Sequence, residues 1–312
     1  MTTHVDEVRD LLARRRDGRT RVGDDSRRAA LVLPGGGMRG AWQIAALAAM
    51  DDLGLRPHID LVVGSSAGAM NGCYFLAGQA HPGVGIYVDH LTGSVLPRRF
   101  VSPARVHKIM DIDWLVDVVL RAEVKLDVAA LRSAPARMLM TCSDLRTGEP
   151  VLFDQQSPDL FEVLRASAAL PVLYGRRPKV AGTRYADGGL TAPVPVAQAV
   201  AAGATDILIL SPSVRGHRWK NLVLPAELTA LAWFTAAAGA RGRRTWAAFP
   251  ERVNTGMALA EGLTTIDGVR ISCIFASPDV GVDRATADRA AVAKCALVGD
   301  RDARTWWGRS GE

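Results

Sequence analysis

The sequence predicts an α/β sandwich in which helices cover both faces of a mainly parallel sheet. From residue 29 onward, short apolar runs alternate with helical patterns, and this order produces parallel sheets. Apolar residues make up 48% of the chain and charged residues 22%, so the chain can bury a sizeable core. With 312 residues it exceeds a typical domain, yet sandwiches of this size often fold around one continuous core. We therefore expect one main domain.

The elements follow in order from the N-terminus. Residues 1–28 contain eight arginines and six acidic residues, which predicts a charged, solvated N-terminal extension with one short helix at Val5–Arg16. The folded domain should then span residues 29–312. Its first half is predicted as strand, glycine loop, helix, strand and helix at Ala29–Leu33, 34–40, Trp42–Leu53, Ile59–Val63 and from Ala67.

Residues 94–132 interrupt this alternation. They mix prolines, basic residues and short apolar groups, which suits an insertion over one end of the sheet, and we expect a lid there. Strands return at Arg137–Cys142, Val151–Phe153, Thr183–Tyr185, Asp206–Leu210 and Val269–Ala276. A final helix is expected over Arg284–Leu297.

The first motif with chemical content is Gly64-Ser65-Ser66-Ala67-Gly68, between an apolar strand and a helix. It matches the nucleophile elbow G-x-S-x-G, in which a strained turn lifts the serine hydroxyl above the sheet edge and the glycines remove side chains that would clash. Ser66 holds the central position. An ordinary glycine-rich turn, with Ser66 capping the helix, would give the same pattern.

A glycine loop follows the first strand and opens the first helix. Its residues are Pro34, Gly35, Gly36, Gly37, Met38, Arg39 and Gly40. Successive backbone N–H groups without side chains can form a concavity at a helix N-terminus, which suits oxyanion stabilisation. The same glycines satisfy the dinucleotide fingerprint G-x-G-x-x-G. That fingerprint needs an acidic residue at the end of the second strand, whereas Asp60 opens that strand, so the nucleotide interpretation is disfavoured.

The third motif is Asp187-Gly188-Gly189 at a strand end. An acid at this position faces the ligand edge of a doubly wound sheet. A β-turn aspartate that bonds its own backbone would give the same Asp-Gly sequence.

In this order, the three motifs resemble those of the patatin-like phospholipase family: G-G-G-x-R-G, G-x-S-x-G and D-G-G. The resemblance extends to segments 141–150 and 165–171 and covers roughly residues 30–213. It implies a three-layer α/β/α sandwich with a mainly parallel central sheet. One departure is Ala192, where many bacterial relatives carry an asparagine. Beyond Ser213 the resemblance is weak.

The resemblance also implies roles for individual residues. Ser66 would be the nucleophile and Asp187 its partner in a Ser-Asp dyad. The amides of Gly36, Gly37 and Met38 would donate to the oxyanion. The remaining motif residues are Gly35, Arg39 and Gly40 in the oxyanion loop and Gly64, Gly68, Gly188 and Gly189 in support.

The implied activity is lipid acyl hydrolysis of the phospholipase A, lysophospholipase or esterase type, through an acyl-enzyme and without metal or cofactor. A carboxylate with a pKa of about 4 is a poor base, so modest turnover is expected. An acyltransferase or thioesterase would use the same dyad, and a catalytically silent lipid-binding module would keep the fold. The order Ser66, Asp187, His217 also permits a triad, although His217 is expected at the surface of a basic loop.

The chain as a whole constrains partners and location. Its four cysteines are far apart with no C-x-x-C pair, which predicts reduced thiols and no zinc site. The N-terminus lacks an apolar signal region, and the stretch Leu224–Ala240 is too short and too charged to span a bilayer, so a cytoplasmic location is expected. The substrate should be a phospholipid or other lipid ester, and no nucleic acid is expected.

Peripheral contact with an anionic membrane is a further expectation. A net charge of +6 favours anionic partners, and aromatic and basic residues interleave late in the chain. A buried aromatic helix with a solvated basic rim would give the same pattern. The residues are Arg215, Arg218, Trp219, Lys220, Trp233, Phe234, Arg241, Arg243, Arg244, Trp246, Phe249 and Arg252.

Overall fold

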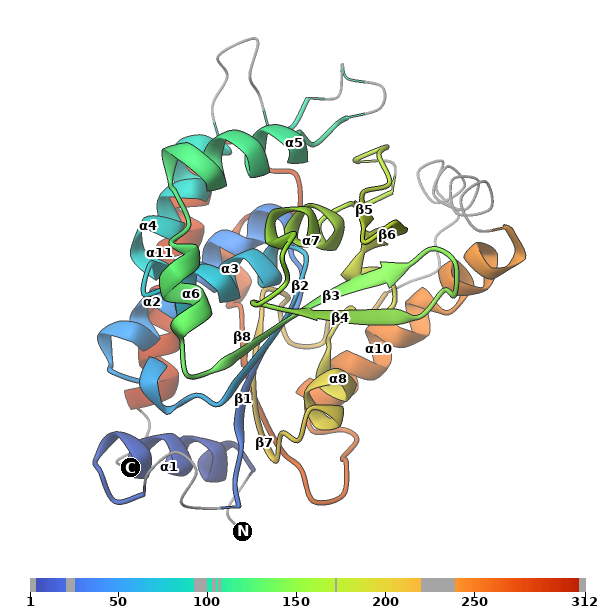
Figure 1. Ribbon diagram of the computed structural model, residues 1–312. Coiled ribbons are helices and arrows are strands. Elements are labelled where there is room, and N and C mark those ends of the chain that lie inside the picture. The colour runs from blue at the N-terminus through green and yellow to red at the C-terminus, as the bar shows by residue number, and fades with distance from the viewer. Residues whose placement is uncertain are drawn as a thin grey trace.

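The computed structural model describes residues 4–20, 26–92, 100–102, 105, 108–171, 173–219 and 239–308. Within these residues, eight strands form one sheet in the order β5-β6-β3-β2-β1-β7-β8, and β4 pairs with β3 (Figure 1). The strands are β1 (Ala29–Leu33), β2 (Leu61–Ser65), β3 (Arg137–Asp144), β4 (Pro150–Asp154), β5 (Lys179–Val180), β6 (Thr183–Asp187), β7 (Asp206–Ser211) and β8 (Arg270–Phe275).

The centre of the sheet is parallel. β1 pairs in parallel with β2 and β7, β2 with β3, and β7 with β8. β4 and β6 pair with β3 in antiparallel fashion, and β5 pairs with β6 likewise. Since β1 has β2 on one side and β7 on the other, the crevice beyond its carboxyl end is the topological switch point at which such sheets bind ligands.

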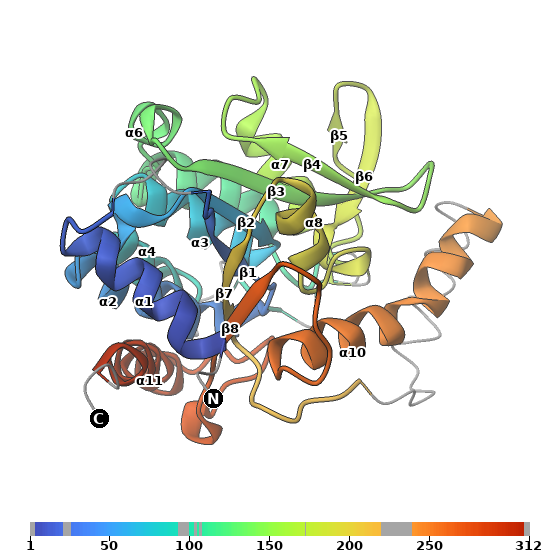
Figure 2. The ribbon, with the colours of Figure 1, turned by 90° about the horizontal axis from the view of Figure 1, so that it is seen from below.

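Helices cover both faces of the sheet, as Figures 1 and 2 show. Alternate residues of β1 enter different cores: Leu31 and Leu33 pack in the core that includes α2, α3 and α11, and Ala30 and Val32 in the core with α8 and α10. The predicted three-layer sandwich is confirmed. The helices are α1 (His4–Arg16), α2 (Gly40–Asp52), α3 (Ala67–Leu76), α4 (Ala80–Gly85), α5 (Ile112–Trp114), α6 (Val128–Ser133), α7 (Leu160–Ser167), α8 (Val196–Ala201), α10 (Phe249–Ala260) and α11 (Arg289–Gly308).

Shorter helical segments join these elements. The 3₁₀ turns are η1 (Gly37–Arg39), η2 (Arg56–His58), η5 (Gly188–Leu190) and η6 (Pro278–Val280). Two π-helical segments are η3 (Ile86–His90) and η4 (Leu115–Glu123).

Helix α1 is packed rather than solvated. Val8, Leu11 and Leu12 are buried in the main core, and the Arg15 side chain is fully buried. Arg15 donates to Asp60 Oδ2 at 2.6 Å and to the carbonyl oxygens of His58 and Arg27. The prediction of a solvated extension is therefore wrong for α1. It was based on the highly charged composition of the segment, which does not show that three apolar side chains and one arginine are buried.

The segment 94–132 and the start of the last helix also bear on predictions from the sequence. The part of 94–132 that the structure describes includes η4, whose residues Leu115, Val116 and Val119 lie in the main core. Residues 93–99, 103–104 and 106–107 lie outside the described residues, and the lid stays a prediction. The last helix begins at Arg289, not Arg284, because Asp288 accepts a hydrogen bond from the Ala291 amide, and it continues to Gly308.

Candidate active site

The register of the sheet brings Ser66 and Asp187 together. Ser65 of β2 pairs with Thr141 of β3, and the next residue of β3, Cys142, pairs with Asp187 of β6. Ser66 and Asp187 therefore occupy one row across three strands. β6 is antiparallel to β3 but overlaps only its last residues, so its carboxyl end still reaches the ligand edge of the sheet.

Ser66 sits on a strained strand-to-helix turn. Its φ is 56° and its ψ −125°, in the region that side-chain-bearing residues rarely adopt. Its side chain makes no capping hydrogen bond to α3, so the simple helix-cap interpretation does not hold. Its amide donates to Ser167 Oγ at 3.0 Å. The hydroxyl is thus left facing the sheet edge.

The two elbow glycines are required by packing. A Cβ on Gly68 would lie 2.0 Å from the Leu33 carbonyl oxygen, and one on Gly64 would lie 2.5 Å from the Gly68 carbonyl oxygen. Both distances are far inside van der Waals contact. The tight approach of α3 to β1 and β2 holds the turn at Ser66 in place.

Asp187 is a buried carboxylate, with 2% of its surface exposed. Its Oδ1 accepts a hydrogen bond from the Gly189 amide at 2.7 Å, which is the local turn expected of an Asp-Gly sequence. Its Oδ2 is buried and has no hydrogen bond of normal geometry within the described residues. Burial raises the pKa of Asp187 to about 6, against the opposing effects of the Ser66 hydroxyl, the Gly189 amide and Arg284.

The glycine loop lies against Ser66. A Cβ on Gly35 would be 3.0 Å from Ser66 Cβ, so only glycine leaves the Ser66 side chain uncovered. Gly37 has a φ of 57°, which glycine adopts without strain. Within the described residues, no hydrogen bond occupies the amides of Gly36 and Gly37. Both amides are available to an oxyanion.

Met38 differs from this pattern. Its amide donates to the Arg284 carbonyl oxygen at 3.2 Å. The implied role of Met38 as a third oxyanion donor is therefore wrong for this conformation, because the donor is already bonded. The remaining motif residues surround the loop: Arg39 ends η1, Gly40 begins α2, and Gly188 and Gly189 form η5 after Asp187.

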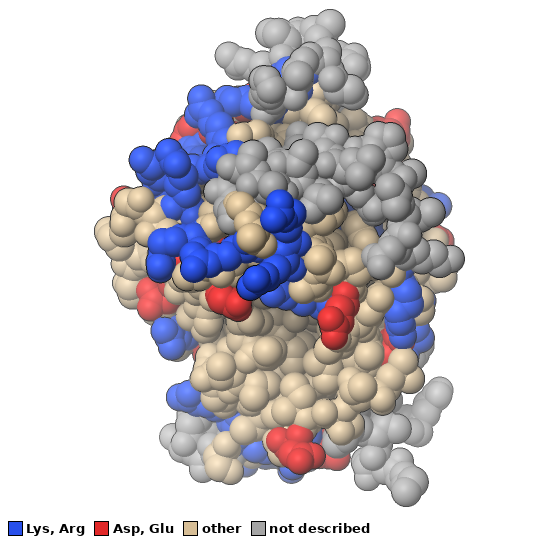
Figure 3. Space-filling model, turned by 90° about the vertical axis from the view of Figure 1, so that its right-hand side faces the viewer, with Lys and Arg blue, Asp and Glu red and all other residues tan. Residues whose placement is uncertain are grey.

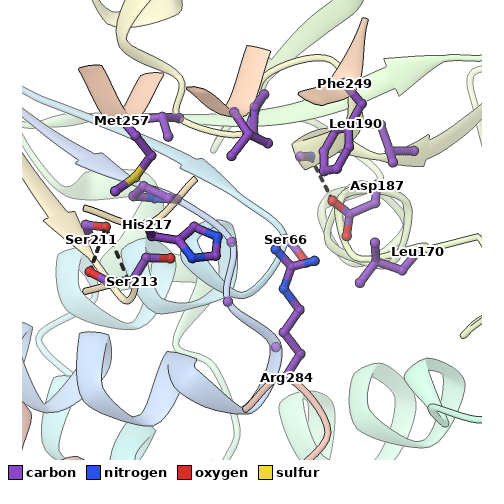
Figure 4. Close-up of a pocket in the computed structure, with 18 residues that line it drawn as sticks. Ser66, Leu170, Asp187, Leu190, Ser211, Ser213, His217, Phe249, Met257 and Arg284 are labelled. Carbon is purple, nitrogen blue, oxygen red and sulfur yellow. Dashed lines mark hydrogen bonds between the residues drawn. The ribbon is translucent and has the colours of Figure 1, made fainter. Parts of the chain in front are cut away.

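Ser66 lines two cavities of different character. The first contains Asp187 and the glycines 35–37, together with His217 and Arg284 (Figure 4). The second shares Gly37, Ser66 and Leu170 with the first and is almost entirely apolar. Its lining includes Met70, Leu91, Phe100, Met110, Ile112 and Leu115. The charged groups are thus confined to the first cavity, whose other lining residues are largely apolar.

Arg284 and His217 are pocket residues that the motifs do not include. Both follow parallel strands of the sheet, His217 after β7 and Arg284 after β8, and emerge at the carboxyl edge. That topological rule was the available signal for Arg284, while His217 was also indicated by the chain order Ser66, Asp187, His217. In Figure 4 both side chains point into the pocket from different loops.

His217 lines the pocket instead of lying in a surface loop, which corrects the expectation for it. Burial lowers its pKa, and the positive charges of Arg39, Arg284 and Arg218 lower it further. Within the described residues its side chain makes no hydrogen bond to Ser66 or Asp187. The geometry does not form a Ser-His-Asp triad.

The described aromatic residues of the late basic segment pack on one another. Phe249 contacts Trp219 edge-on, with 4.9 Å between the ring centroids, and stacks with Trp246, with 5.6 Å between the ring centroids. Arg218 is bound by Glu261 at 2.6 Å. These contacts favour the buried-aromatic interpretation for this part of the segment.

A basic surface nevertheless remains. Arg241, Arg243 and Arg244 are exposed, and Figure 3 shows Lys and Arg atoms gathered on the right-hand side of the molecule as it stands in Figure 1. Lys220, Trp233 and Phe234 lie outside the described residues. Contact with an anionic membrane stays a prediction.

Other sequence predictions concern thiols, metals and membrane spans. All four cysteines are free thiols, and Cys73, Cys142 and Cys295 are buried. The described residues contain no cluster of three His, Cys, Asp or Glu side chains placed to hold a metal ion. None of the described helices is long and apolar enough to cross a bilayer, while residues 224–238 of the candidate stretch lie outside them.

The fold and the serine elbow define an α/β/α protein of the kind seen in two solved structures. VipD from Legionella pneumophila aligns over 92% of this chain and 68% of its own, with a TM-score of 0.50 and 14% identity. Human GIVD cytosolic phospholipase A2 aligns over 98% of this chain and 62% of its own, with a TM-score of 0.54 and 12% identity. These likenesses show a shared fold.

Residues 31–200 match the family model described as patatin-like phospholipase, and the chain belongs to that family. Uncharacterized protein YjjU of Escherichia coli is 29% identical over 188 residues, which are 59% of this chain and 51% of YjjU. An uncharacterized NTE family protein of Mycobacterium tuberculosis is 30% identical over 201 residues, 62% of this chain and 51% of its own. The chain thus matches about half the length of these curated relatives.

Proposed function

We propose that this protein is a lipid acyl hydrolase that uses Ser66 as nucleophile and Asp187 as base. The observation that carries the proposal is the position of Ser66 in the lining of two cavities, one that also contains Asp187 and Arg284 among apolar side chains and one that is almost entirely apolar. An acyl chain fits the chemistry of the apolar cavity, and the alcohol part of the ester fits the cavity that contains the charged groups. Family membership supports the same reaction class.

The proposed reaction proceeds in two steps. Ser66 Oγ attacks the ester carbonyl carbon while Asp187 takes its proton, and the amides of Gly36 and Gly37 hold the negative oxygen. The tetrahedral intermediate collapses, the bond to the alcohol breaks, and Asp187 returns the proton to the leaving oxygen. Water then attacks the acyl-enzyme, giving its proton to Asp187, and the fatty acid leaves as the Ser66 hydroxyl re-forms.

The first test is serine labelling together with ester hydrolysis. A fluorophosphonate probe should label the wild-type protein and fail to label Ser66→Ala. Hydrolysis of p-nitrophenyl butyrate should fall by a factor of about 10³ or more in Ser66→Ala and in Asp187→Asn, because each removes a group that takes part in bond formation or proton transfer. Ser133→Ala, which changes an exposed serine, should behave as wild type.

Near-normal hydrolysis in either dyad variant would remove that residue from the mechanism. A folded wild-type protein that neither labels nor hydrolyses esters would instead favour a lipid-binding module. Products that carry the acyl group on an added alcohol would identify an acyltransferase that uses the same acyl-enzyme.

A further inference from the structure

The guanidinium of Arg284 lines the pocket without an ion-pair partner among the described residues. Arg284 lies in the loop between η6 and α11, and its side chain lines the same cavity as Ser66 and Asp187 (Figure 4). In the described part of the chain it makes no ion pair and no side-chain hydrogen bond, and its guanidinium carbon lies 5.7 Å from the centre of the Trp219 ring. Five N–H donors therefore face the pocket with a flat aromatic support but without an acceptor.

A second arginine reinforces the positive potential. Arg39 is half-buried at the end of the glycine loop, and its Nη1 donates to Ser213 Oγ at 3.5 Å, at the limit of a hydrogen bond. Its Nε is buried without a partner within the described residues. Burial and the charge of Arg284 lower the pKa of Arg39 to about 10. Two repelling cations are stabilised by a bound anion, which neutralises both.

The carboxylates near Arg284 and Arg39 do not pair with them. Asp187 attracts Arg284 but directs one oxygen to Gly189, and it forms no ion pair with Arg284. Asp283 acts on Arg39 only at longer range and is exposed, with its carboxylate bonded to Ala285 and Thr286. Arg284 lines the cavity that contains Asp187 and is absent from the lining of the apolar cavity. A ligand that pairs with Arg284 carries its negative charge in the first of these cavities.

We propose that Arg284 determines substrate specificity by binding the phosphate of a lipid ester whose reacting carbonyl lies at Ser66 and whose acyl chain occupies the apolar cavity. This inference rests on the proposed acyl hydrolysis and deepens it. A guanidinium binds a phosphate through two parallel hydrogen bonds, which a lysine cannot reproduce. His217, Ser211 and Ser213 add polar groups to the lining of the same cavity, and the nearby charge of Arg39 adds to its positive potential.

The first experiment measures binding without catalysis. In the Ser66→Ala protein, monomeric dihexanoyl phosphatidic acid and dihexanoylglycerol differ only by the phosphate, and calorimetry compares their affinities. The phosphatidic acid should bind about tenfold to a hundredfold more tightly, and Arg284→Gln should abolish that preference. Arg284→Lys should keep only part of it. Arg243→Gln removes the same charge from an exposed helix and should leave the preference intact.

The outcomes separate the two proposals. Binding does not require hydrolysis, so this result stands or falls independently of the acyl-hydrolase proposal. A preference that survives Arg284→Gln, or that Arg243→Gln reduces equally, would overturn the role of Arg284. If inorganic phosphate binds as tightly as phosphatidic acid, the claim that the ligand is a lipid ester would be overturned. If Arg284→Gln unfolds at a lower temperature than the wild-type protein, Arg284→Lys is used for the test instead. An unchanged preference for phosphatidic acid in Arg284→Lys would contradict bidentate binding.

The second experiment measures hydrolysis with Ser66 present. Arg284→Gln should lower kcat/KM for dihexanoyl phosphatidic acid about tenfold to a hundredfold and change that for dihexanoylglycerol by less than about threefold. An equal fall for both substrates, with a shifted pH midpoint, would mean that Arg284 acts through Asp187 and not on the substrate.

Discussion

Asp187 ends a strand inside the protein, and burial raises the pKa of its carboxyl to about 6. A general base works best when its pKa lies near the working pH. The sequence alone suggested a carboxylate with an ordinary pKa of about 4, hence a weak base. Burial therefore makes Asp187 better suited to accept a proton from Ser66 than its residue type implies.

The pH dependence of activity follows from this pKa. Asp187 must be ionised to act as a base, so kcat/KM for neutral p-nitrophenyl butyrate should rise about tenfold per pH unit below 6 and level off above about 7. Stopped assays read at one common alkaline pH measure this profile free of the indicator's own titration. A flat profile from pH 4.5 to 8, in protein that stays folded, would contradict Asp187 as the base.

At the residue scale, the motifs predicted most of the site. Ser66 and Asp187 lie in short motifs whose glycines have steric or conformational reasons, and such motifs can be recognised in the sequence alone. The bonded amide of Met38 and the side chain of Arg284 could not be predicted in this way. Both depend on where the loop before α11 lies, and that loop has no periodicity and no motif.

At the element scale, close packing of α3 on the sheet holds Ser66, the proposed nucleophile, in place. The amino end of α3 approaches β1 so tightly that Gly68 has no space for a side chain. The strain at Ser66 persists because these contacts over-determine the turn. Stability and catalysis are therefore linked at this helix end.

Gly68→Ala should disrupt both properties. A Cβ there would lie 2.0 Å from the Leu33 carbonyl oxygen, so α3 must shift, at a cost of about 2 kcal/mol or more. Chemical denaturation and kcat/KM should both show the loss. Gly85→Ala in α4 is the matched control, since its nearest neighbour is Asp89 Oδ2 at 3.4 Å, and it should unfold as wild type or slightly later. Wild-type activity in folded Gly68→Ala would argue against a fixed elbow.

Element types were predictable where apolar periodicity was strong, as in β1, β2 and β7. The direction of β6 was not, because Thr183–Asp187 has the same alternation whichever way it pairs. The start of α11 was misplaced for a related reason. The alanine-rich segment after Arg284 suits a helix, and only the bond from the Ala291 amide to Asp288 fixes where the helix begins.

Across the whole molecule, the amino-terminal edge of the sheet is closed by α1. Arg15 ties α1 to β2 through Asp60, and Asp60 also accepts a hydrogen bond from the Ala29 amide at 2.7 Å. This network lies at the opposite end of the strands from Ser66. Stability and catalysis are therefore separable here, unlike at α3.

Arg15→Gln should lower the free energy of unfolding by about 2–4 kcal/mol, because it removes the positive charge that pairs with Asp60 and the guanidinium that donates to two carbonyl oxygens. The folded variant should keep kcat/KM within about twofold of wild type. Arg14→Gln changes the exposed neighbouring arginine and should alter neither quantity. Urea denaturation and ester hydrolysis provide the two measurements. Lost activity at full folding would show that α1 acts on the site.

Arg284, in the loop before α11, makes two contributions to the site. Its carbonyl oxygen accepts a hydrogen bond from the Met38 amide, and its side chain lines the cavity. The proposed reacting groups, in contrast, all come from residues 35–187, inside the segment that the family model matches. Much of the pocket lining, such as Leu170 and Leu190, comes from that segment too, but the arginine comes from outside it. A substitution at this one late position can therefore change the charge of the cavity while the serine, the aspartate and the glycine loop keep their sequence.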